Sequence, residues 1–226
     1  MDAMSLVRLL QLASPALPIG AYSYSQGLEW EVASGNVRDA ATAQAWIGDL
    51  LMHVQARGEA PVVWRLCSFA QNADWEAYAE WHAWFRASRE TSELSSETLQ
   101  MGGALARLVT DLDLADDAAR SMLARCAPVA LPGAYAIAAR ALAVTASDAL
   151  TAYLWSWLEN QVLAALKSVP LGQVAGQRML LALGAAIPDL VGHAQAADEE
   201  DITSFAPGLA IASARHETQY TRLFRS

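Results

Sequence analysis

The sequence predicts an all-α fold, a globular, bundle-like domain of roughly eight to ten helices, from three observations. Apolar residues recur at helical spacing in segment after segment, and helix-capping residues precede several of these segments. Strand signals are poor, because β-branched residues are few and alternating runs are short. The chain has no internal repeat and no low-complexity linker, so one domain over residues 1–226 is the simplest organisation.

Helical patterns are clear in the first half of the chain. Asp39 can cap a helix that runs towards Arg57, with Gly58 just past its end. Pro61 can open the next helix, because the first helical turn tolerates its missing N–H group. Apolar residues at helical spacing continue over residues 62–69, 75–88 and 98–112.

The second half is also predicted to be helical, and it begins after a proline- and glycine-containing break at residues 128–133. Ser147 can cap a long apolar helix, with Asp148 well placed in its first turn. A further helix is expected from about residue 173 to residue 187. Four consecutive acids at 198–201 repel one another and prefer water, which predicts an exposed loop.

Composition limits the classes of partner. Hydrophobic residues make up 54% of the chain and charged residues only 17%, so either part of the surface is apolar and covered by partners, or alanine inflates the hydrophobic count. The net charge of −9 argues against nucleic acid and anionic membrane as main partners, because both attract clustered Lys and Arg.

The sequence favours a cytoplasmic protein. Cys67 and Cys126 form no paired motif, which suits a reducing compartment. No secretory signal is evident. The longest charge-free stretch, residues 9–28, is interrupted by Pro15 and Pro18, so no membrane-spanning helix is expected there.

Common motifs of nucleotide and metal enzymes are absent: the sequence lacks a phosphate loop, a dinucleotide glycine fingerprint, paired Cys-x-x-Cys motifs and His-Glu-x-x-His. No two histidines have the i, i+4 spacing that places ligands on one helical face. Each is therefore interpreted as solvated or at the core rim; they are His53, His82, His193 and His216. His193 lies near the acidic run and could hold a divalent ion weakly, which leaves a metallochaperone role as one alternative.

One segment approaches the nucleophile elbow of serine hydrolases. Residues 23–27 read Ser-Tyr-Ser-Gln-Gly, but Ser23 stands where the elbow requires glycine, and the segment follows a proline turn rather than a strand. A small hydrolase that uses Ser23 or Ser25 is the enzyme alternative. The sequence favours a protein that is not an enzyme.

Residues 14–30 form an unusual segment. Two prolines and Gly20 force a fixed, non-helical lead-in, and a helix can then begin around residues 23–26. Tyr22 and Tyr24 combine a large apolar area with a polar tip, which suits interfaces. Physical chemistry alone favours the simpler interpretation of a capped helix start with buried tyrosines.

Residues 85–100 carry alternating charges. If the segment is helical, Arg86 with Glu90 and Arg89 with Glu93 form i, i+4 pairs of opposite charge. On spacing alone, a solvated helix face explains this pattern.

Two further segments combine apolar and basic residues. Residues 154–177 include a long apolar helix that ends with Lys167, which complements the negative end of the helix dipole, as a core helix would. The tail, residues 216–226, carries large apolar side chains that should not be left in water, namely Tyr220, Leu223 and Phe224. The tail therefore either packs on its own core or docks on a partner.

These four stretches resemble the UreF-type urease accessory proteins. The segment 14–30 is similar to the N-terminal signature of that family, and 85–100 to its Arg-Glu-Thr-x-Glu-Leu element. The tail resembles the family's Gln-Tyr-Ser-Arg-Leu-Phe ending, with Thr221 in place of serine, and Ala21 stands where glycine is common. The resemblance covers both ends and the middle of the chain.

The resemblance implies an all-helical, usually dimeric adaptor that joins UreD (also called UreH) to the GTPase UreG, in a complex that acts on apo-urease. Nickel and GTP would be handled chiefly by these partners, so no cofactor or metal site is expected in this chain, which could modulate GTP hydrolysis. Residues 1–20 would form a lead-in and 214–226 a docking tail, with Lys167 facing UreG and Arg222 facing UreD. The expected partner-binding residues are Tyr22, Tyr24, Gln26, Glu29, Arg89, Glu90, Glu93, Lys167, Gln173, Tyr220, Arg222 and Phe224.

Overall fold

The computed structural model describes residues 2–226, and this part of the chain is helical without any strand, which confirms the predicted all-α class. Helices α3, η2 (a π-helix) and α4 are continuous, and only a two-residue turn separates α10 from α11, so the described residues form ten helical rods. The α-helices are α1 (Ala3–Leu12), α2 (Leu28–Ala33), α3 (Ala40–Asp49), α4 (Ala60–Asn72), α5 (Trp75–Ala87), α6 (Ser92–Asp111), α7 (Asp117–Arg125), α8 (Leu131–Ala141), α9 (Ala146–Ser168), α10 (Gln173–Gly184), α11 (Ile187–Ala196) and α12 (Pro207–Glu217). The π-helix η2 spans Leu50–Glu59, and two short 3-10 turns are η1 (Ala21–Ser23) and η3 (Glu199–Asp201).

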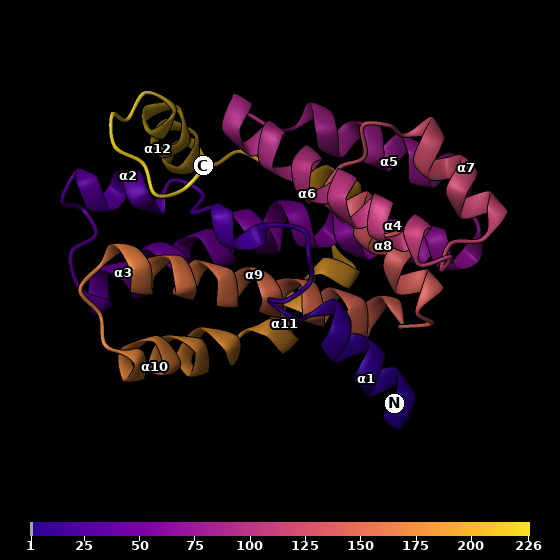
Figure 1. The fold of residues 1–226 in the computed structure, drawn as a ribbon, viewed down its shortest axis with the longest axis horizontal. Helices are drawn as coiled ribbons and strands as arrows, with labels where there is room; N and C mark the ends of the chain where they lie inside the picture. Colours follow the sequence, from indigo (N-terminus) through magenta and orange to yellow (C-terminus); the bar gives the residue numbers. More distant parts are fainter. Residues whose placement is uncertain (1) are drawn as a thin grey trace.

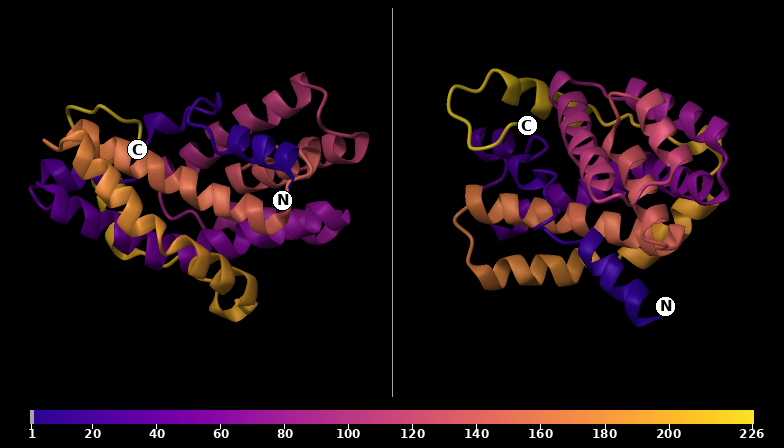
Figure 2. Two further views of the ribbon diagram at one scale, coloured as in Figure 1. Left: turned by 90° about the horizontal axis from the view of Figure 1, so that it is seen from below. Right: turned by 45° about the vertical axis from the view of Figure 1, so that its right-hand side comes forward.

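Two helices, α4 and α9, contact most of the others. The α4 helix packs against α5, α8, α9 and α11, and α9 packs against α10 along its other side (Figure 1). The α6 helix lies on α8, while α12 and the chain end lie beside α2 (Figure 2). Fully buried side chains from these helices fill one core; the largest include Tyr78, Phe85, Leu66, Leu105, Leu150, Leu154 and Leu158.

The predicted helix end at Gly58 is wrong. Asp39 caps α3 as expected, with a capping box shared with Thr42, but the helix continues through η2 into α4 as far as Asn72. Gly58 is needed for a close approach instead, because a Cβ there would lie 2.7 Å from the backbone oxygen of Thr203. Pro61 is tolerated at the start of α4, where the π-helix ends.

Two other predicted helix starts are shifted. Thr145 caps α9 in place of Ser147, because its side chain accepts the backbone N–H of Asp148 at 3.1 Å. The helix expected around residues 23–26 begins only at Leu28, after Gly27 with a φ of 78°. Gly27 is fixed sterically as well, since a Cβ there would lie 2.8 Å from the Cβ of Ala212 in α12.

A second close backbone approach sets the position of α6. A Cβ at Gly102 would lie 2.3 Å from the carbonyl oxygen of Val129, so only glycine lets the chain before α8 cross this helix. The crossing segment is held by two hydrogen bonds: the Ala130 N–H donates to His82 Nε2 at 2.9 Å, and the Leu131 N–H donates to Thr98 Oγ1 at 3.1 Å. Burial lowers the pKa of His82 to about 4, so this histidine serves as a neutral core acceptor and not as a rim residue.

Within the described residues, one helical stretch, Gln173–Ala196, is long and apolar enough to cross a membrane by length and composition. It comprises α10 and α11, carries Arg178 and Asp189, and packs on α9, α3 and α4. A membrane-spanning helix rarely carries such charges, so this stretch fits a helix of the bundle. The acidic residues 198–201 that follow are exposed, as predicted.

Candidate functional site

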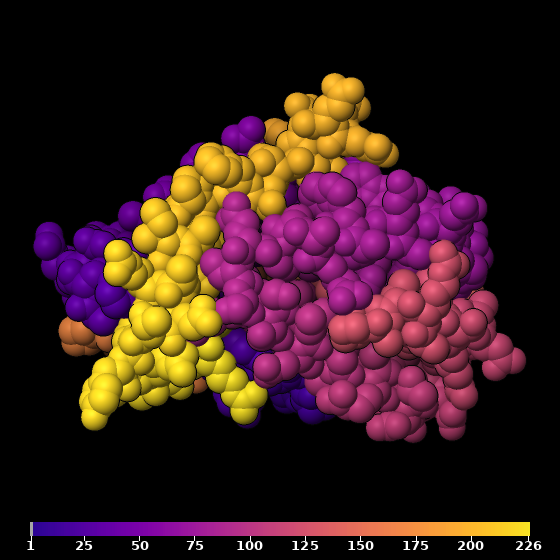
Figure 3. Space-filling model, turned by 90° about the horizontal axis from the view of Figure 1, so that it is seen from above, coloured from indigo at the N-terminus to yellow at the C-terminus, as the bar shows by residue number. Residues whose placement is uncertain are grey.

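The end of the chain folds back onto the segment between α1 and α2. The backbone N–H of Arg225 donates to the Ser23 carbonyl at 2.8 Å, and the N–H of Ser25 donates to the Ser226 backbone oxygen at 2.7 Å. The Ser25 hydroxyl adds a third bond to that oxygen at 2.6 Å. Phe224 is buried by this contact, so part of the tail packs on its own chain. Figure 3 shows the yellow C-terminal segment lying across this face of the molecule.

His216 lies at the centre of a charged cluster that we call the histidine cluster: Glu29, Glu93, His216 and Arg222. The His216 side chain is fully buried, with Nδ1 at 2.9 Å from a carboxylate oxygen of Glu93 and Nε2 at 3.0 Å from one of Glu29. Each ring nitrogen therefore faces a carboxyl group on a different helix, so the ring bridges α2 and α6.

The same carboxylates hold the tail. Glu29 accepts the backbone N–H groups of Leu223 at 2.7 Å and Phe224 at 2.9 Å, while Glu93 accepts a bond from Arg222 Nη1 at 3.1 Å. His216 thus joins α2, α6 and α12 to the chain end. The interpretation of His216 as a solvated or rim residue is wrong, because the acids around it are distant in sequence.

A chain of hydrogen bonds connects this region to α9. Gln26 donates to Glu97 at 2.8 Å and accepts the indole N–H of Trp157 at 2.8 Å. The Ser226 hydroxyl also donates to Glu97 at 2.8 Å. Tyr24, which is buried, donates to Gln100 at 2.8 Å. All four sequence motifs therefore meet at one place, although they are separated by up to two hundred residues.

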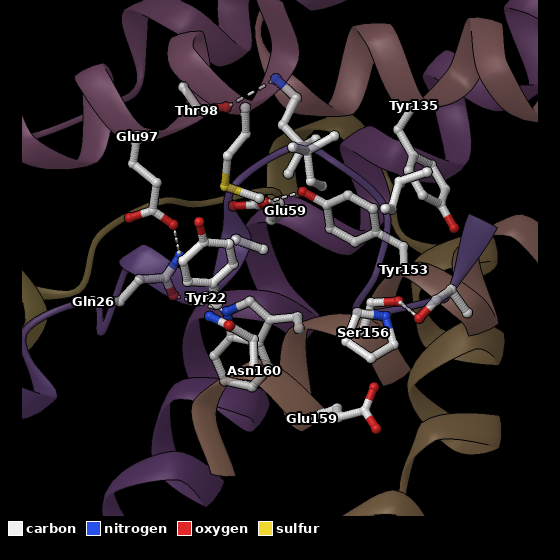
Figure 4. A pocket seen from close by; sticks show the side chains of 18 of the residues that line it. Tyr22, Gln26, Glu59, Glu97, Thr98, Tyr135, Tyr153, Ser156, Glu159 and Asn160 are labelled. Atoms are coloured by element: carbon white, nitrogen blue, oxygen red, sulfur yellow. Dashed lines mark hydrogen bonds between the residues drawn. The ribbon is translucent and has the colours of Figure 1, made fainter. Parts of the chain in front are cut away.

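Behind this network lies a cavity of about 110 Å³ into which Glu59, Glu97 and Tyr153 point (Figure 4). Arg89 Nη1 lies 3.2 Å from a Glu59 carboxylate oxygen, and the Tyr153 hydroxyl donates to the other oxygen. The Arg89 guanidinium also covers the ring of Phe85, 4.2 Å from its centroid. Glu59 occupies the last position of η2, so the π-helical turn sets where this carboxylate lies.

The i, i+4 pairs predicted for residues 86–93 do not form. The α5 helix ends at Ala87 and α6 begins at Ser92, because Thr91 caps α6 by accepting the Leu94 N–H. Arg89 pairs instead with Glu59 across the bundle. The segment is therefore a helix junction at which Arg89 and Glu93 face inwards, while Glu90 is exposed.

Lys167, the only lysine of the sequence, lies exposed near two aromatic rings. Its Nζ is 5.8 Å from the ring centroid of Tyr22 and 5.6 Å from that of Phe224. These cation–π distances connect the end of α9 to both the lead-in and the tail.

The remaining predicted contact residues are mostly on the surface. Tyr22 is 64% exposed and Tyr220 is fully exposed, which suits the predicted contact role of both side chains. Glu90 and Gln173 are exposed as well, at the α5–α6 junction and at the start of α10. Among the described residues, no group of three or more His, Cys, Asp or Glu side chains has metal-binding geometry, and His193 is exposed and faces the Asp189 carbonyl.

The buried carboxyl group of Glu97 should make the free energy of unfolding depend on pH. Burial raises the pKa of Glu97 to about 7 from 4.5, so between these values the unfolded state loses its proton while the folded state keeps it. Stability should fall as the pH rises through this window and level off above it. Glu97→Gln should remove this loss. The free energy of unfolding of the variant, relative to that of the parent, should therefore increase by about 3 kcal/mol between pH 4 and pH 8.

Urea unfolding of both proteins from pH 4 to pH 8 measures this difference. Glu90→Gln is the matched control, because it removes an exposed carboxylate seven residues away, just before the start of α6. A stability difference between Glu97→Gln and the parent that stays constant with pH would contradict the prediction.

Comparison with known proteins places the sequence among urease accessory proteins. The sequence model of the family described as UreF matches residues 37–184. A protein of Azoarcus sp. named "Urease accessory protein UreF" is 56% identical over 225 residues, covering 99% of this chain and 96% of that protein. Proteins of the same name from Methylobacillus flagellatus and Janthinobacterium sp. are 51% and 49% identical, covering 98% and 100% of this chain and the same shares of their own lengths.

Proposed function

Since the chain belongs to the UreF family of urease accessory proteins, we propose that it is a non-catalytic adaptor that holds UreD (UreH) and the GTPase UreG together during nickel delivery to apo-urease. In this role the chain supplies surface and timing, and UreG hydrolyses GTP. Nickel is carried chiefly by the partners, and the assembly works in the cytoplasm.

The observation that carries the proposal is the convergence of four distant segments on one surface. Buried bonds among Gln26, Glu97 and Trp157 make a rigid base beneath it. Around that base, Tyr22, Tyr220 and Leu223 stay 64% exposed or more. Exposed aromatic and apolar side chains held on a rigid base are typical of interface hot spots, so this surface supports a docking role.

The first test concerns Lys167. We expect Lys167→Ala to weaken binding to UreG about tenfold while it changes the free energy of unfolding by no more than about 1 kcal/mol, since exposed cation–π contacts contribute little to stability. Titration of purified UreG measures the affinity. Arg178→Ala, which removes an exposed cation from α10, is the control.

A footprint makes the same test without a mutation. Because Lys167 is the only lysine, an amine-reactive reagent modifies a single side chain in addition to the chain start. Bound UreG should slow that modification. An unchanged affinity together with an unchanged modification rate would count against the contact.

The proposed assembly also includes a homodimer of this chain, as expected from the family resemblance. Sedimentation equilibrium of the purified chain tests it: a mass of one chain at all concentrations would contradict the dimer. Mixing the chain with UreD and UreG then tests the adaptor role itself, which requires one complex that contains both partners.

A further inference from the structure

A surface groove lies beside the proposed adaptor surface, between α6 and the segment that follows α1, next to the end of the chain. It has a volume of about 680 Å³. One wall is α6 and the other is the segment between α1 and α2. The residues of this α6 groove are Pro18, Ile19, Gly20, Tyr22, Ser23, Tyr24, Ser96, Leu99, Gln100, Ala104, Arg107 and Arg225.

The charge of the α6 groove is opposite to that of the whole chain. The sequence has 24 acidic and 15 basic residues, yet the groove contains Arg107 and Arg225 and no carboxylate. Arg225 Nη1 donates to Gln100 Oε1 at 3.2 Å. Arg107 is exposed and has no carboxylate within 4.0 Å anywhere in residues 2–226.

Both guanidinium groups lie beside the turn of α6 from Gln100 to Gly103. A Cβ at Gly103 would lie 3.5 Å from Arg107 Nη1, so this side chain reaches back towards Gly103, one turn from Gln100. Three residues of an α-helix rise only about 4.5 Å. One carboxylate placed between them could therefore bond to both arginines, which is the chemistry that guanidinium groups favour.

The length of the groove and its apolar residues also limit which ligand it fits. The wall from Ser96 to Arg107 spans about 16 Å along the helix, which matches about five residues of extended chain. Pro18, Ile19 and Leu99 offer apolar contact along it. We propose that the α6 groove binds an extended segment of a partner protein that carries an acidic residue flanked by apolar residues. A free inorganic anion would use the arginines but would leave the apolar walls unused.

This inference rests on the proposed function and deepens it, because it assigns a chemistry to one docking segment of the maturation partners. The first experiment measures the affinity of the full chain for UreD and for UreG. Arg107→Glu should weaken one of the two affinities about tenfold or more, and added salt should reduce the difference. Arg125→Glu, an exposed arginine on α7, is the matched control and should leave both affinities unchanged.

The outcomes separate the two proposals. If the parent chain binds neither protein, the proposed function fails and this inference fails with it. If the parent binds and Arg107→Glu binds equally well, only the inference fails.

The second experiment identifies the occupant. A photo-cross-linking residue replaces Ala104, inside the groove, and the cross-linked segment in the assembled complex is sequenced. We expect a segment of a partner with an Asp or Glu next to apolar residues, and replacement of that acid by Lys should restore binding to Arg107→Glu. Cross-links to a second copy of this chain, or calorimetric binding of inorganic phosphate without any partner cross-link, would overturn the proposal.

Discussion

Replacing His216 with alanine is expected to lower the free energy of unfolding by about 3 kcal/mol. The imidazole is fully buried between Glu29 and Glu93, and its removal leaves two carboxylates near each other without the group that bridges them. Arg222 still faces Glu93, but it is 40% exposed and cannot replace a buried ring. Urea unfolding at neutral pH measures the loss.

A matched control separates this effect from the loss of any histidine. His53 is exposed on η2, so His53→Ala should change the free energy of unfolding by about 0.5 kcal/mol or less. If His216→Ala also changes the free energy of unfolding by no more than His53→Ala does, the histidine cluster does not stabilise the fold.

The tail provides a second measurement. Glu29 binds both the His216 ring and the backbone N–H groups of Leu223 and Phe224, so a displaced Glu29 should release the tail. Trypsin cleaves after arginine, and cleavage after Arg222 should therefore be faster in His216→Ala than in the parent chain. Equal cleavage rates would argue that the tail is held without His216.

The helical class was predictable because period-3.6 apolar patterns and capping residues are local features. The cap at Asp39 illustrates this, since donor and acceptor lie three residues apart. Gly58 shows the limit: its role depends on the backbone of Thr203, almost 150 residues away, and no local rule distinguishes it from a helix stop.

The candidate site was predictable as a set of segments but not as a geometry. Glu29, Glu93 and Arg222 were identified through the family resemblance, and the structure brings them together. His216, the common partner of Glu29 and Glu93, was missed, because spacing rules search for two ligands on one helix and this cluster uses three elements. Glu59 was missed for the same reason: only the fold brings it to Arg89.

Deleting residues 221–226 is expected to abolish the complex with UreD. The deletion removes the Arg222 contact to Glu93, the buried Phe224 ring and the backbone bonds to Glu29, so the surface built from the four segments loses one of its sides. Co-purification of the truncated chain with UreD at parental yield would refute the prediction.

The deletion alone cannot distinguish a tail that contacts UreD from a tail that shapes the surface UreD contacts, because the same residues stabilise the fold. Leu223 resolves this, since its side chain is 71% exposed while its backbone N–H holds Glu29. Leu223→Ala keeps the backbone bond and should leave stability unchanged. If it weakens the UreD complex about tenfold, the side chain itself docks; if only the deletion does so, the tail acts by positioning Glu29 and Lys167.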